Sequence, residues 1–311
     1  MLIKNICSIG VIFLGMFAAT LFPVIGAPLK GLETPLLMVI LFVSLLGISV
    51  RATVKFVKSS FWHIVLLTVC KLVILPVALY FLFKFIWPDF AVAALLIAGI
   101  STGVSAPFVA LLAGGNRGFV VVLVVITSLC CVFTLPLLVR VLLGGNVEID
   151  ALNMLVKLGI VVFIPLICSE IVQAVSPRVV KIVLSKSFIV NTALFCILGI
   201  SVFSQNAEHL HANPTVVLEA LAVDFIIAIA AFICAVIVYH RFSLDSQIGA
   251  MVILVSINNF LVVVLANHFF GFREILASAL YSVPFFLVVI PAQLYRGWYH
   301  KRAEGRSLSD A

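Results

Sequence analysis

The chain has 311 residues, of which 64% are apolar and only 10% are charged. A soluble domain is typically about 45–50% apolar and about 25% charged, so a mean hydropathy of +1.34 leaves no room for a sizeable water-soluble domain. Disordered, collagen-like and disulfide-framework proteins are excluded, and the class is a polytopic membrane protein. The net charge of +7 is therefore interpreted by its position relative to the bilayer, with no nucleic acid implied.

Ten apolar stretches approach the length of about 20 residues that a spanning helix needs. The fold expected is all-α, with ten transmembrane helices at 6–28, 35–50, 61–86, 91–113, 118–144, 151–174, 186–204, 215–240, 246–270 and 274–297. The second stretch is short. The first has no small-residue cleavage pattern at its end, so we interpret it as a retained span and not as a signal peptide.

Lysine and arginine predict the orientation of these spans. Thirteen of the 19 lie on the N-terminal side of the predicted membrane, and only Lys30 and Arg273 lie in the opposite loops. We therefore expect both termini in the cytoplasm, with a prokaryotic inner (plasma) membrane as the location. The seven cysteines lie in apolar stretches without metal-ligand spacing, so we interpret them as packing residues and expect no metal and no cofactor.

An internal repeat is visible at an offset of about 152 residues. The letters LGISV at 46–50 recur at 198–202, and SAPF at 105–108 corresponds to SINNF at 256–260. A shift of five spans places the copies in opposite orientations, which is the usual build of secondary transporters. We therefore expect an inverted repeat of 1–148 and 149–297, followed by a short, disordered cytoplasmic tail at 298–311.

Polar residues interrupt the fourth and ninth stretches near their middles. These are Thr102, Ser105 and Pro107 in the fourth, and Ser256, Asn258 and Asn259 in the ninth. Pro107 removes a backbone donor and disfavours helix at the residue before it. We predict two broken helices with a substrate or coupling site between them. The alternative is a tolerated proline kink, with asparagines that bond between helices.

Two charged residues lie deep inside predicted spans. Lys71 is about ten residues into the third span, and Asp224 is about nine residues into the eighth. A charge at the bilayer centre costs about 2.5–3.5 kcal/mol even on the lenient insertion scale, and such residues mark transport pathways by default. One hypothesis is a buried pair, or two groups facing a central cavity, that couples transport to protons. The other is a structural ion pair with no role in turnover.

Several short motifs resemble one known family. They are PLLMVILFVSLLG at 35–47, Lys71 with LP at 75–76, AGGN at 113–116, TLP at 134–136, NN at 258–259 and ALYSV at 279–283. In order and spacing they resemble the bile acid:sodium symporter family, from about residue 10 to 298. The resemblance implies two inverted five-helix repeats, in which helices one, two, six and seven form a panel and broken helices four and nine cross in a core. It also implies alternating-access transport of an organic anion.

Departures from that family fall on its sodium ligands. The family's Ser-Asn pair at the break of helix four falls here on Ala106 and Pro107, and its two hydroxyl ligands of helix five fall on Val120 and Val124. Its Glu and the following Gln of helix nine fall on Leu254 and Asn258, and its Gln of helix three falls on Lys71. Sodium needs a shell of oxygen ligands, which Val and Leu side chains lack. We therefore hypothesise a sodium-independent member, proton-coupled or facilitative, in which the Lys71 ammonium takes the place of one lost cation.

The expected partners are the lipid bilayer and a small organic anion, because a lysine near half-helix N-termini favours a carboxylate or another anion. A His-Asn pair of helix ten in sodium-coupled relatives falls on Pro284-Phe285 or on Phe286, depending on the register. The nearest alternative is an auxin-efflux-carrier-like exporter, which often has proline at the crossing. A non-transporting membrane sensor is the alternative of another class. No enzyme is expected, because Asp224 is the only deep aspartate and no HExxH motif occurs.

Overall fold

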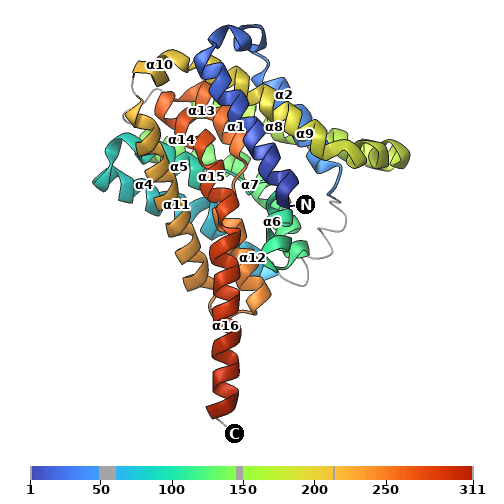
Figure 1. The fold of residues 1–311 in the computed structure, drawn as a ribbon, viewed down its shortest axis with the longest axis vertical. Helices are drawn as coiled ribbons and strands as arrows, with labels where there is room; N and C mark the ends of the chain where they lie inside the picture. Colours follow the sequence, from blue (N-terminus) through green and yellow to red (C-terminus); the bar gives the residue numbers. More distant parts are fainter. Residues whose placement is uncertain (1, 49–60, 145–149, 213, 310–311) are drawn as a thin grey trace.

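The computed structural model describes residues 2–48, 61–144, 150–212 and 214–309, with side chains between 10 and 300. Helices account for all regular structure in this part of the chain, which confirms the all-α class (Figure 1). The repeat motif at 46–50 ends outside the described residues.

The first half of the chain begins with α1, a short 3₁₀ helix and α2, at Leu2–Leu21, Pro23–Leu29 and Glu33–Leu45. A continuous helix at Phe61–Ile86 contains a π turn at Cys70–Ile74 and ends as α4 at Leu75–Ile86. A 3₁₀ turn at Pro88–Phe90 and the helices α5, α6 and α7 follow, at Ala91–Gly99, Ala106–Ala113 and Arg117–Leu143.

The second half contains α8 to α16. Their bounds are Ala151–Val175, Pro177–Gln205, Ala207–Ala212, Thr215–Tyr239, Leu244–Val255, Asn259–Phe269, Phe272–Leu280, Ser282–Leu287 and Val289–Ser309.

Seven helical stretches in the described residues are long and apolar enough to span a membrane, or up to eight if a bent pair counts as one. The bent pair is Gly10–Leu21 with Pro23–Leu29, which turn by 105°. The first span predicted at 6–28 was therefore wrong at its end, because prolines at 23 and 28 cannot continue an α-helix. The count of ten spans and the inverted arrangement stay predictions.

Two other boundaries differ from expectation. Helix α9 begins at Pro177 and not at 186, so residues that we assigned to a charged loop are its first turns. Helix α16 continues to Ser309, so the tail that we expected to be disordered is helical over most of its length. Figure 1 shows this helix projecting from the body of the molecule down to the C-terminus.

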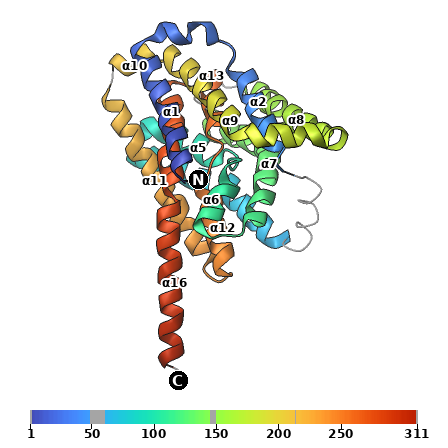
Figure 2. The ribbon, with the colours of Figure 1, turned by 45° about the vertical axis from the view of Figure 1, so that its right-hand side comes forward.

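The helices pack in two groups. Helices α1, α2, α8 and α9 contact one another and form what we call the panel. The second group, here the core group, includes α4 to α7 and α11 to α14. Figures 1 and 2 show the panel helices in the upper part of the molecule, away from the end at which α16 projects. Both interrupted helices belong to the core group.

Candidate functional site

Both predicted interruptions are present. Helix α5 ends at Gly99, and α6 begins at Ala106, so residues 100–105 form a first break. Helix α12 ends at Val255, and α13 begins at Asn259, so residues 256–258 form a second break. Ile100 and Ser256, at the exits of the two preceding helices, are extended, which frees carbonyl groups at those helix ends.

The two breaks lie directly against each other. The backbone N–H of Asn258 donates to the carbonyl oxygen of Ser101 at 2.9 Å. A Cβ atom on Gly103 would lie only 2.3 Å from the carbonyl oxygen of Ile257. Glycine is therefore required at 103, because any side chain there would push the two breaks apart.

Lys71 reaches the broken end of α12. Its side chain is fully buried, and its ammonium donates to the carbonyl oxygen of Leu254 at 3.1 Å. Lys71 lies in the π turn that ends two residues before Pro76, which has no N–H to donate to the preceding turn. The ammonium thus meets the C-terminal, negative end of a half-helix. We expected Lys71 near half-helix N-termini, and its hydrogen bond is instead to a half-helix C-terminus.

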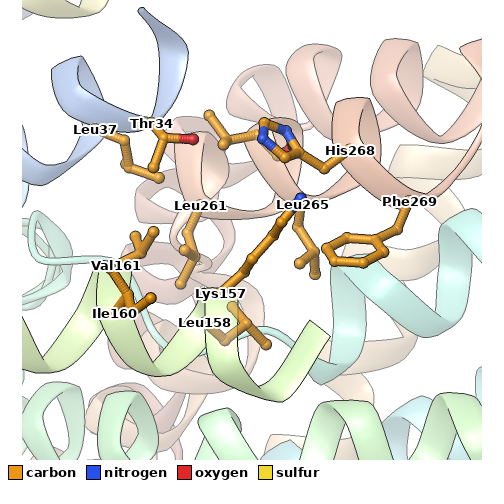
Figure 3. Close-up of a pocket in the computed structure, with 11 residues that line it drawn as sticks. Thr34, Leu37, Lys157, Leu158, Ile160, Val161, Leu261, Leu265, His268 and Phe269 are labelled. Atoms are coloured by element: carbon orange, nitrogen blue, oxygen red, sulfur yellow. Dashed lines mark hydrogen bonds between the residues drawn. The ribbon is translucent and has the colours of Figure 1, made fainter. Parts of the chain in front are cut away.

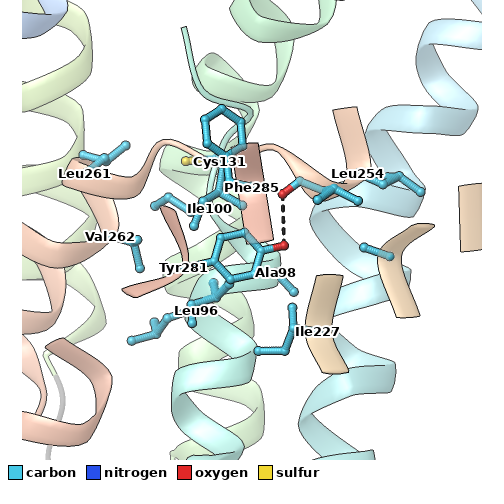
Figure 4. Close-up of a cluster of buried hydrophobic side chains, with 14 of the residues drawn as sticks. Leu96, Ala98, Ile100, Cys131, Ile227, Leu254, Leu261, Val262, Tyr281 and Phe285 are labelled. Atoms are coloured by element: carbon cyan, nitrogen blue, oxygen red, sulfur yellow. Dashed lines mark hydrogen bonds between the residues drawn. The ribbon is translucent and has the colours of Figure 1, made fainter. Parts of the chain in front are cut away.

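The neighbouring carbonyls of α12 are bonded as well. The Thr102 hydroxyl donates to Ile253 at 3.4 Å. The Tyr281 hydroxyl donates to Val255 at 3.0 Å, a bond drawn in Figure 4 inside a buried apolar cluster. The last three carbonyls of α12 are therefore each bonded by a side chain from another element.

Lys71 and Asp224 do not pair. Asp224, in α11, is fully buried, and neither of its carboxyl oxygens has a hydrogen-bond partner among the described side chains and backbone. It lies close enough to Tyr281 for the two side chains to interact electrostatically. Arg273 and Asp89, by contrast, form an ion pair at 2.9 Å. The predicted buried pair, and with it the structural ion pair, was therefore wrong.

A cavity of about 350 Å³ lies between the panel and the two breaks. Of the predicted site residues, Ser105, Asn258 and Asn259 line it. The other five, which are Lys71, Asp224, Thr102, Pro107 and Ser256, do not. Lys71 and Asp224 therefore do not face this cavity. Thr102 bonds instead to α12, and the Ser256 hydroxyl is buried without a hydrogen-bond partner among the described residues.

The cavity wall combines phenylalanine with neutral polar groups. Its aromatic residues are Phe13, Phe108, Phe188, Phe195, Phe260, Phe285 and Phe286, and no lining residue is ionisable. Phe285 and Phe286 both contribute, so either register of the resemblance at helix ten reaches the cavity. The first residues of α13 line the cavity, and the side chain of its N-cap residue Asn258 makes no capping hydrogen bond. The positive end of this helix dipole therefore faces the cavity.

The panel contributes polar residues that the sequence reading missed. Ser187, Asn191 and Thr192 of α9 line the cavity. The Asn191 amide donates to the Ser44 hydroxyl of α2 at 3.2 Å, which fixes its orientation. The only available signal was the presence of polar residues in an apolar helix. They lie near the start of the span expected at 186–204, where polar residues need no explanation.

A smaller cavity of about 180 Å³ lies elsewhere, between α2, α8 and α13 (Figure 3). Two basic side chains line it, Lys157 and His268, and the Lys157 ammonium lies 5.0 Å from the ring centre of Phe269. No residue of either break lines it. We therefore place the candidate site in the larger cavity.

One comparison with known proteins gives a match. The model of the Sodium Bile acid symporter family matches residues 34–213, which is more than half of the chain. The match includes the first break and the polar residues of α9. No curated protein matches the chain.

Proposed function

The chain belongs to the sodium bile acid symporter family, and we propose that it carries a small organic anion by alternating access without sodium. Membership of this family and the apolar helices make it a polytopic membrane transporter. What we propose beyond this is the substrate class, the sodium independence and the coupling.

The cavity between the panel and the breaks carries the proposal. It is lined by residues of α1 and α9 on one side and by both breaks on the other. Secondary transporters bind substrate where discontinuous helices meet, and they expose the site alternately by moving one helix group against the other. A ligand held here touches both groups, so its binding responds to their relative position.

The wall favours an anion with an apolar body. The positive end of α13 supports a negative head group, because helix N-termini present backbone N–H groups to anions. The phenylalanines favour an aromatic or branched hydrocarbon part. The absence of lining acidic residues, among those that the structure describes, removes repulsion of an anion.

The proposal of sodium independence rests on the residues at the positions that correspond to the family's sodium ligands. Val120 and Val124 are fully buried, and Leu254 is 1% exposed. Hydrocarbon side chains in a packed interior offer no oxygen to a hard cation. We include proton coupling through Asp224, because a buried carboxyl without a partner is far less costly when neutral than when charged. Lys71 has no part in this step, since its ammonium is bonded to α12.

The family match favours this reading over the auxin-efflux-carrier-like exporter, although Pro107 at the first break suits either. It also favours a transporter over a non-transporting sensor.

The test begins with ligand binding. We expect phenylacetate to raise the melting temperature of the purified protein, and the neutral phenylacetamide to leave it unchanged. A Ser187→Phe variant, which fills the cavity from α9, should lose the response. Ser185→Phe is the matched control, because Ser185 is exposed on the same helix and makes the same kind of backbone bond.

Uptake of phenylacetate into proteoliposomes then tests the coupling. Equal uptake with sodium or choline outside supports sodium independence, and uptake that requires sodium would contradict it. If no aryl or alkyl carboxylate or sulfonate stabilises the protein, the anion assignment is wrong.

A further inference from the structure

The smaller cavity, of about 180 Å³, places two basic side chains against an apolar wall. Eight of its eleven lining residues are aliphatic or aromatic, and the other three are Thr34, Lys157 and His268. Figure 3 shows the Lys157 side chain extending from α8 toward the helix that carries His268, with Thr34 across the cavity from that histidine. Among the residues that the structure describes, no acidic residue lines this cavity. Its wall therefore suits an oxygen anion that is attached to a hydrocarbon body.

The Lys157 ammonium is held at the wall of this cavity. It lies 5.0 Å from the ring centre of Phe269, within the range of a cation–π contact. This contact joins α8 of the panel to α13 of the core group, whereas a lysine near the end of a span commonly extends into water. In the described part of the chain no carboxylate forms an ion pair with Lys157. The ring carries no full negative charge, so the ammonium keeps its charge and its hydrogen-bond donors for an anion.

His268 adds a second basic group. Its Nδ1–H donates to the Val264 carbonyl oxygen at 3.1 Å, because a carbonyl oxygen can only accept. This bond fixes the ring and leaves Nε2 to meet a ligand. A proton shared between Nε2 and a phosphate oxygen, together with the Thr34 hydroxyl, gives an anion two further donors.

The cavity is continuous with a surface of the kind that faces lipid. Ile160, which lines the cavity, is exposed and belongs to a row of exposed apolar side chains at helical spacing along α8. The row consists of Val156, Ile160, Ile164, Ile167 and Ile171. In a spanning helix such a row lies against acyl chains, which are as apolar as these side chains. An acyl chain along this row therefore leads to the cavity.

Both basic residues lie near helix ends, where lipid head groups are found. Lys157 is in the first two turns of α8, which begins at Ala151, and His268 is in the last turn of α13, which ends at Phe269. The hydrocarbon core of a bilayer is about 30 Å thick, so the ends of spanning helices meet the head groups. Basic pockets between transmembrane helices bind the head groups of anionic lipids.

We propose that this cavity binds the phosphate group of an anionic phospholipid, with its oxygens on Lys157, His268 and Thr34 and an acyl chain along the exposed row of α8. The lipid then contacts the panel through α2 and α8, and the core group through α13. It favours the relative position of the two groups in which this cavity exists. That consequence rests on the proposed alternating access, whereas the binding of the lipid does not.

Retention of lipid by the purified protein tests this site. Protein in a neutral detergent is mixed with phosphatidylglycerol or with phosphatidylcholine of the same acyl chains, and bound lipid is counted by native mass spectrometry. We expect wild type to retain one phosphatidylglycerol in preference to phosphatidylcholine, and to melt at a higher temperature in its presence. Inorganic phosphate at the same concentration should not raise the melting temperature.

Single substitutions then locate the lipid. Lys157→Gln should weaken the retention of phosphatidylglycerol about tenfold, as the loss of one hydrogen bond from a charged group does. The matched control is Lys84→Gln, because Lys84 is also exposed and lies 5.6 Å from the Tyr80 ring centre, but does not line this cavity. His268→Gln and Thr34→Val should weaken retention as well, and they carry the same comparison if Lys157→Gln does not fold.

Equal retention of the two lipids by wild type would overturn the proposal, as would equal retention of phosphatidylglycerol by the cavity variants and by Lys84→Gln. Stabilisation by inorganic phosphate as strong as that by phosphatidylglycerol would assign the site to a free anion and overturn the lipid assignment. Displacement of the lipid by phenylacetate would overturn it too, and would place the carried anion here. Failure to find any carried anion would leave lipid retention unchanged, so this proposal and the proposed function fail separately.

Discussion

The Lys71 ammonium lies 3.1 Å from the carbonyl oxygen of Leu254, a residue 183 positions later in the chain. This contact joins the π turn of one span to the broken end of another. It also explains why Lys71 does not meet Asp224. The ammonium is already bonded to α12, and the carboxyl is left without a hydrogen-bond partner among the described residues.

The Tyr281 hydroxyl supplies one of the three bonds to the end of α12. Tyr281→Phe should lower the free energy of unfolding by about 1–3 kcal/mol, because the Val255 carbonyl loses its donor in a buried place. Thermal melting of the purified variant measures this. Tyr299→Phe is the control, because Tyr299 is 37% exposed and lies outside the breaks. Equal melting of the two variants would mean that the α12 end does not need its donors.

Gly103 should tolerate no side chain. In Gly103→Ala the new methyl group would meet the Ile257 carbonyl, which is backbone and gives way only if the breaks separate. We expect a lower melting temperature and loss of anion uptake. Gly10→Ala is the matched control, since nothing lies within 4 Å of its added Cβ. A fully active Gly103→Ala would show that the contact between the breaks is dispensable.

The fold class and both breaks followed from the sequence, because composition and interrupted apolar stretches reflect local physical constraints. Pro107 and Asn258 mark helix ends wherever the helices lie. The partners of Lys71 and Asp224 did not follow. Spacing along the chain places a charge in a span, but only packing decides whether it reaches a carboxylate or a helix end. The α9 lining at Asn191 was missed for the same reason, since its role depends on which face meets the breaks.

Asp224 should behave differently from a charge held in an ion pair. We expect Asp224→Asn to melt no lower than wild type at neutral pH, because the amide removes a possible buried charge and no bond is lost. The uptake of the carried anion should lose its dependence on external pH in this variant. A large loss of stability would indicate a partner that the carboxyl needs. A pH profile unchanged from wild type would reject Asp224 as the proton site.

Glu33, just before the apolar part of α2, accepts hydrogen bonds both from the loop after α1 and from α9. Burial raises the pKa of this carboxyl, but hydrogen bonds from Ser201, Gln205 and the Gly31 N–H outweigh that effect, and its pKa lies below the ordinary value of 4.5. A lowered pKa in the folded state means that the stabilisation is fully present above pH 4.5 and is lost as the pH falls through the lower, folded value.

Glu33→Gln should therefore lower the melting temperature at pH 7, and the difference from wild type should shrink in acid below about pH 4.5. Melting curves of both proteins across this range check it. Glu208→Gln serves as control, because Glu208 is exposed and should change little at any pH. A difference that grows in acid would reverse the sign of the argument and show that Glu33 binds its proton more tightly when folded.

The stacked rings of Phe195 and Phe260 join the panel to the second break, with ring centres 4.2 Å apart and planes 14° from parallel. The alternating access that we propose requires the panel and the core group to move against each other, so this contact is expected to open or slide during each cycle. In a background with the native cysteines replaced, a short thiol cross-linker between Phe195→Cys and Phe260→Cys should stop uptake. Reduction of a cleavable linker should restore it.

Each single cysteine variant treated with the same reagent separates cross-linking from modification of the cavity wall. Uptake at the normal rate by fully cross-linked protein would mean that α9 and α13 stay together through the cycle. The moving boundary would then lie elsewhere, since the rings line the proposed substrate cavity from its two opposite groups.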